Sequence, residues 1–150
     1  MKIWKNLMLF SLGGAGYMGI EVLWRGWSHG SMFLAGGSCF LLLGLCSKSK
    51  RPLPVRAAMG ACMITGVELL AGLLVNRNYS VWDYRAMPLN FRGQVCLPFT
   101  LLWLPLSLGG MLLHRVVDGA LQRRTEAVST APWPFLTAAP AAAWARRRLW

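Results

Sequence analysis

The sequence predicts an all-α integral membrane protein built as a bundle of four transmembrane helices. Hydrophobic residues make up 55% of the 150 residues and charged residues only 14%. A soluble domain carries about 25% charged residues, so this chain has too little polar surface to cover itself in water. Four apolar runs alternate with short polar or basic segments, which is typical of polytopic topology. The net charge of +11 is spread between these runs, so we expect no nucleic-acid binding.

The first two spans are predicted at residues 7–24 and 31–46. About 20 apolar residues cross the ~30 Å hydrocarbon core, and the first run meets this length. A signal peptide is the alternative, because basic residues precede this run. The run stays apolar through Leu23, so we expect it to be retained as a helix. The second run is short, and we expect it to recruit Gly30 and Ser31.

The third and fourth spans are predicted at residues 55–75 and 95–113. Pro98 and Pro105 lie in the fourth span, where each removes a backbone donor and frees a carbonyl. These spans complete a transmembrane domain over residues 1–124. The remaining residues, 125–150, are rich in Ala and Pro and basic. We interpret them as a flexible tail that rests on an anionic membrane surface.

The distribution of basic residues predicts the orientation. Twelve of the sixteen Lys and Arg residues lie in the N-terminus, the middle loop and the C-terminal region, and four lie in the other two loops. Because cytoplasmic loops carry the excess of basic residues, we expect both termini to be cytoplasmic. The predicted location is the cell (inner) membrane, with multiple passes through the lipid bilayer.

The spans contain two acidic residues, in the similar segments GIEVL (residues 19–23) and GVELL (residues 66–70). Both spans run outward, so the similarity suggests two parallel copies of a helical hairpin. Glu21 lies near the boundary with Arg25 at i+4, where an interfacial ion pair can form. Glu68 lies deeper, and its partner must come from another helix, a loop or a proton. A structural and a functional role for Glu68 both stay open.

Small residues repeat every four positions in the third span. One ladder contains Ala57, Ala61 and Thr65, and a second contains Ala58, Cys62 and Gly66. Such spacing lets membrane helices approach closely, although Gly and Ala are also common in membrane helices in general. We expect Glu68 to point into the bundle.

A polar loop with several functional side chains precedes the fourth span. Asp83 can accept backbone donors or pair with an arginine on the outer face, from Arg25, Arg77 or Arg92. Trp82 and Tyr84 are suited to the headgroup level. Pro88 and Asn90 favour a turn, and the Gln94 amide can bridge the loop and the bundle. This loop either seals the bundle or binds a ligand.

Cysteine and histidine patterns predict no metal site and no cofactor. The four cysteines form no CxxC pair, and His29 and His114 are expected at the two boundaries. No phosphate-loop, HExxH or GxSxG motif occurs, so we expect no enzymatic activity.

The segments GYMGIEVLWRGWSHGSMFLAGG, GVELLAG and NYSVWDYRAMPLNFRGQVCLPFTLLW resemble the CmpB-like family of bacterial ABC-transporter permeases. The resemblance covers roughly residues 17–113, and its most specific part is residues 82–99. It implies a polytopic membrane fold and a transport role, for which a true permease needs a separate ATPase. Arg85 departs from the family, which usually has Ser there.

Together these features favour a small transporter-type protein, with an outward-facing polar site around Glu68 that includes Glu21, Arg25 and Asp83. We expect a homo-oligomer or other membrane subunits, because four spans alone rarely enclose a pathway. The alternative is a structural or interaction subunit of a membrane complex, with no transport of its own.

Overall fold

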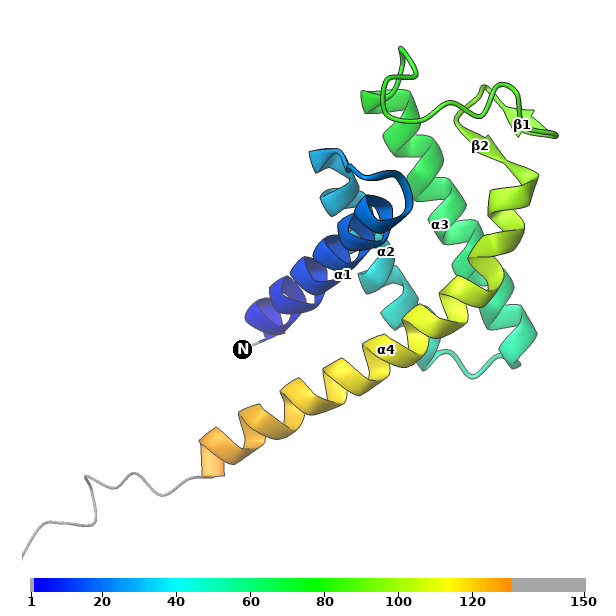
Figure 1. Ribbon diagram of the computed structural model, residues 1–150. Helices are drawn as coiled ribbons and strands as arrows, with labels where there is room; N and C mark the ends of the chain where they lie inside the picture. Colours follow the sequence, from blue (N-terminus) through cyan, green and yellow to red (C-terminus); the bar gives the residue numbers. More distant parts are fainter. Residues whose placement is uncertain (1, 131–150) are drawn as a thin grey trace, which may run out of the picture.

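Four long helices form the body of the protein (Figure 1). The computed structural model describes the backbone of residues 2–130 and the side chains of residues 3–127. The helices are α1 (Lys2–Arg25), α2 (Gly30–Lys48), α3 (Leu53–Val75) and α4 (Leu97–Thr130). Each is long and apolar enough to cross a membrane, so the predicted all-α class is confirmed. Helix α2 begins at Gly30, with His29 as its N-cap.

The fourth helix differs at both ends from the predicted span of about residues 95–113. The fourth helix begins at Leu97, because Val95 and Cys96 form strand β2, which pairs antiparallel with β1 (Asn90–Phe91). The helix then continues past residue 113 to Thr130. Pro98 therefore lies in the first turn, where its missing N–H breaks no helical bond, and Pro105 is the proline inside the helix. The predicted flexible tail covers residues 125–150: residues 125–130 instead belong to α4, and residues 131–150 lie outside the described part of the chain.

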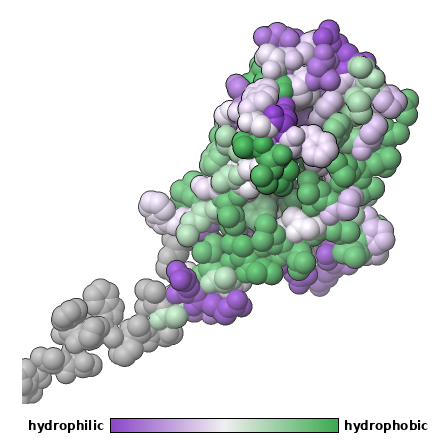
Figure 2. All heavy atoms as spheres, in the orientation of Figure 1, coloured by the Kyte–Doolittle hydropathy of each residue, from purple (hydrophilic) through white to green (hydrophobic). Residues whose placement is uncertain are grey.

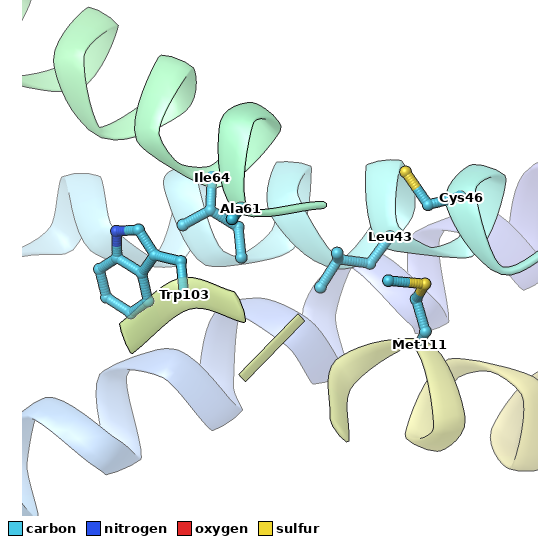
Figure 3. Close-up of a cluster of buried hydrophobic side chains, with 6 residues drawn as sticks. All are labelled: Leu43, Cys46, Ala61, Ile64, Trp103 and Met111. Atoms are coloured by element: carbon cyan, nitrogen blue, oxygen red, sulfur yellow. The ribbon is translucent and has the colours of Figure 1, made fainter. Parts of the chain in front are cut away.

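The helices pack as two hairpins joined through α2. Helix α1 packs mainly on α2 and α3 mainly on α4, while α2 contacts both α3 and α4. The core lies where these three helices meet, and Figure 3 shows its six buried side chains: Leu43, Cys46, Ala61, Ile64, Trp103 and Met111.

Small residues bring the helices together, as expected in lipid. Ala57 and Ala61 are buried, and the Ser107 Oγ of α4 donates to the carbonyl oxygen of Ala57 at 3.1 Å. A Cβ at Gly60 would lie 2.6 Å from that of Ser107, so only glycine fits there. The second ladder, which contains Ala58, Cys62 and Gly66, is exposed instead.

The surface has the polarity of a membrane protein. Figure 2 shows a broad hydrophobic region between hydrophilic ends, with the polar loop between α3 and α4 at the top. Large apolar side chains are exposed on all four helices, among them Leu23, Leu34, Leu74 and Leu112. In water this surface would be unfavourable, whereas lipid tails solvate it.

Candidate functional site

Glu68 is held between a helix and a loop. Its Oε1 accepts a hydrogen bond from the Tyr84 hydroxyl at 3.1 Å, and its Oε2 accepts one from the Trp103 Nε1 at 3.1 Å. The Tyr84 ring stacks on Phe99, with the ring centroids 4.8 Å apart. Burial, and then the nearby Glu68 carboxylate, raise the pKa of the Tyr84 hydroxyl, which therefore remains a donor near neutral pH. The partners of Glu68 come from α4 and the loop, as expected.

Glu68 and Glu21 line the same small cavity. Its volume is about 50 Å³, which is room for a few water molecules and too little for a drug-sized ligand. The wall also includes Arg25, Trp82 and Tyr84. Glu68 lies seven residues before the end of α3, which places its Cα about 10 Å along the helix from the loop.

The Glu21–Arg25 ion pair forms as predicted and closes one side of this cavity. The Arg25 Nη2 lies 2.8 Å from the Glu21 Oε1, and the Ser28 hydroxyl donates to the Oε2 at 2.5 Å. The Arg25 Nη1 donates to the carbonyl oxygen of Val81 at 2.6 Å. Glu21 therefore has two donors, and Arg25 ties α1 to the polar loop, whereas the two donors described for Glu68 are both neutral.

A buried pair of amides fixes the loop over the cavity. The Asn76 Nδ2 donates to the Gln94 Oε1 at 3.0 Å, and the Gln94 Nε2 donates to the carbonyl oxygen of Asn76 at 3.0 Å. Asn76 is 0% exposed and Gln94 3% exposed. The Asn76 side chain also bonds the backbone of Val81 and Trp82. Gln94 thus bridges the loop and the bundle, as the sequence suggested.

The main-chain carbonyl oxygen of Gln94 also accepts a hydrogen bond, from the Trp82 Nε1 at 2.9 Å. Trp82 is thereby turned toward the bundle, where it lines the cavity. Farther out, Pro88 lies in an exposed turn, and the Asn90 side chain bonds the backbone of Arg85, Met87 and Gly93.

Asp83 accepts a backbone donor as predicted, from the Arg85 N–H at 3.0 Å, but its ion pair is not with Arg25, Arg77 or Arg92. Asp83 is exposed and pairs with Arg85, whose Nη2 lies 2.7 Å from its Oδ2. Hydrogen bonds from Arg85 hold the pKa of the Asp83 carboxyl below its usual range. Asp83 does not line the cavity. Arg85, which stands where the family usually has Ser, is thus the residue that forms the ion pair with Asp83.

Four residues of the site were not predicted from the sequence: Tyr17, Cys39 and Trp103 in the cavity wall and Asn76 beneath the loop. A signal existed for the two aromatic residues. Tyr and Trp prefer the membrane interface. A Tyr or Trp buried within a span needs a hydrogen-bond partner for its O–H or N–H, so it indicates a polar group nearby.

Comparison with protein-family models shows the family to which the chain belongs. A family model described as "Putative ABC-transporter type IV" matches residues 18–144. The chain belongs to this family. The match extends beyond the expected limit near residue 113, so part of the tail has a counterpart in the ABC-transporter type IV family. No curated protein and no solved structure matches the chain.

Membership in the ABC-transporter type IV family and the four apolar helices together describe a multi-pass, transporter-like membrane protein. Within residues 3–127, no group of three or more His, Cys, Asp or Glu side chains is arranged to hold a metal ion.

Proposed function

We propose that this chain is a membrane transport protein in which Glu68 takes up and releases a proton from the outer side. The observation that supports the proposal most is the pair of neutral donors on Glu68, from Trp103 and Tyr84. An acid within a span with no cation beside it is costly when ionised, and such residues mark proton or ion paths in membrane proteins.

The two donors suit an acid that changes its protonation state. The indole N–H can only donate, so the Oε2 acts as an acceptor in both states. The tyrosine hydroxyl can donate or accept, so a protonated Oε1 can in turn donate a hydrogen bond to the Tyr84 oxygen. Both states of Glu68 keep two hydrogen bonds, and the few waters that fit the cavity would relay the proton. We expect the loop from Trp82 to Gln94 to act as a gate over this site.

The test is proton flux through the full-length protein in liposomes with an internal pH-sensitive dye. We expect an imposed pH gradient to decay faster than in protein-free liposomes, and Glu68→Gln to return the rate to that of protein-free liposomes. Glu126→Gln removes an acid from an exposed position on α4 and is the matched control. Equal flux through Glu68→Gln and the unmodified protein would exclude the proposed role.

The alternative is a structural or interaction subunit, and the dense hydrogen bonding around Asn76 and Gln94 favours it. In that case Glu68 fixes the loop on the bundle and binds nothing. Glu68→Gln would then reduce assembly or membrane abundance, and the unmodified protein would carry no flux of its own. If the protein is a true permease, we expect a separate ATPase as its partner.

A further inference from the structure

A second pocket lies at the opposite end of the bundle from the polar loop. It has a volume of about 390 Å³ and lies between the end of α2, the first turn of α3 and the middle of α4. Its wall includes Lys48, Arg56, His114, Arg115 and Asp118. This volume is in the usual range for small-molecule and headgroup sites, unlike that of the Glu68 cavity.

The pocket has an excess of positive charge. Its single carboxylate, Asp118, is held by the Lys5 Nζ at 2.7 Å and approached by the Lys48 Nζ at 3.9 Å. In the described part of the chain, neither Arg56 nor Arg115 has a carboxylate within 4.0 Å. Two guanidinium groups therefore remain uncompensated at one site.

Three residues of the wall have a buried polar atom without a hydrogen-bond partner among the described residues: Arg56, His114 and Asp118, whose Oδ1 has only the ion pair with Lys5. His114 is 4% exposed and packs against Phe40, with the ring centroids 5.2 Å apart, and its Nδ1 has no hydrogen-bond partner within the described residues. The Arg56 Nε is also buried without a partner there. An unsatisfied buried polar group destabilises a protein, so such groups commonly point to a missing polar partner.

We propose that this pocket binds a phosphate group, supplied by the headgroup of an anionic lipid or by a soluble phosphate. The guanidinium fork matches phosphate oxygens in geometry and charge. Basic pockets between transmembrane helices at a membrane surface bind anionic headgroups in this way. Lys5 neutralises Asp118, which would otherwise repel the phosphate. The proposal is independent of the role of Glu68.

The test uses the full chain in detergent and native mass spectrometry with phosphatidylglycerol or phosphatidylcholine. We expect the unmodified protein to retain phosphatidylglycerol preferentially. The double variant Arg56→Gln/Arg115→Gln should bind it at least about tenfold more weakly, since one charge-assisted hydrogen bond is worth about a factor of ten. Arg77→Gln/Arg92→Gln removes the same charge at the loop end and should bind as the unmodified protein does. Arg115→Gln alone, on an exposed residue, is the fallback if the double variant does not fold.

Competition by inorganic phosphate and glycerol phosphate separates the two sources. Displacement of phosphatidylglycerol at millimolar concentrations would assign the site to a soluble phosphate, and resistance to displacement would assign it to a lipid. The proposal is overturned if the two double variants retain phosphatidylglycerol equally and neither soluble phosphate binds.

Discussion

Glu68 differs from Glu21 in what surrounds its carboxylate. Glu21 has the Arg25 guanidinium at 2.8 Å, whereas Glu68 is bonded by an indole N–H and a phenol. Both acids line one cavity, although they come from different hairpins. Neutral donors can bond either protonation state of a carboxyl group. This difference supports the proposed proton-binding role of Glu68.

Tyr84→Phe tests the hydrogen bond to Glu68 alone. The variant keeps the ring that stacks on Phe99 and removes the hydroxyl. We expect it to destabilise the protein by about 1 to 3 kcal/mol, the range from a neutral to a charged hydrogen bond, and to lower the denaturation temperature in detergent. Tyr79→Phe is the control, because its hydroxyl bonds the Arg92 carbonyl on the exposed side of the loop. Equal denaturation temperatures for the two variants would contradict this account.

The sequence indicated which charged residues matter in the site, but it did not show which side chains they contact. Glu68 could be singled out, because an acid in an apolar run is conspicuous, and the Glu21–Arg25 pair follows from helical spacing. Asp83 could not be placed, since the loop backbone decides which arginine is near, and Arg85 is two residues away. Trp103 comes from 35 residues farther along the chain, which no local pattern reveals.

The element that organises the site is the loop between α3 and α4. It is held by Asn76 and Gln94, each of which bonds the other through its side chain, and by the Arg25 bond to Val81. Gly72 allows this arrangement, because a Cβ there would overlap the Gln94 side chain. The position of Tyr84 against Glu68 depends on these contacts.

Asn76→Ala should therefore loosen the loop. The change leaves buried groups of Val81, Trp82 and Gln94 without partners, each worth about 1–3 kcal/mol. We expect faster proteolysis of the loop and a lower denaturation temperature. Asn78→Ala, which removes an exposed side chain bonded to Ser80, should leave both measurements unchanged. A loop equally resistant in both variants would show that the amide pair does not hold it.

Hydropathy sufficed to predict the four helices but not every boundary. The start of α4 was misplaced because Val95 and Cys96 are as apolar as the helix that follows, although they pair with Asn90 and Phe91. The helix continues beyond the predicted end of the span because charged residues limit a span in lipid, not a helix. Lys5 forms an ion pair with Asp118, which ties the beginning of this extension to α1.

For the whole molecule, the two pockets lie at opposite ends of one bundle, and the charge distribution predicts which end is cytoplasmic. On a cysteine-free background, a cysteine at Ser80 should react with an impermeant thiol reagent added outside, and one at Ser49 only after the membrane is opened. Labelling of both positions from outside would refute the predicted orientation. Labelling from outside of the cysteine at Ser49 alone would indicate the opposite orientation.

The protonation of Glu68 can be measured by infrared difference spectroscopy of the full-length protein in lipid across a pH titration. If Glu68 exchanges a proton, a carboxylic-acid carbonyl band should disappear as the pH rises. The band should be absent in Glu68→Gln and present in Glu126→Gln. A band that persists in Glu68→Gln, or a titration with no such band, would contradict the account.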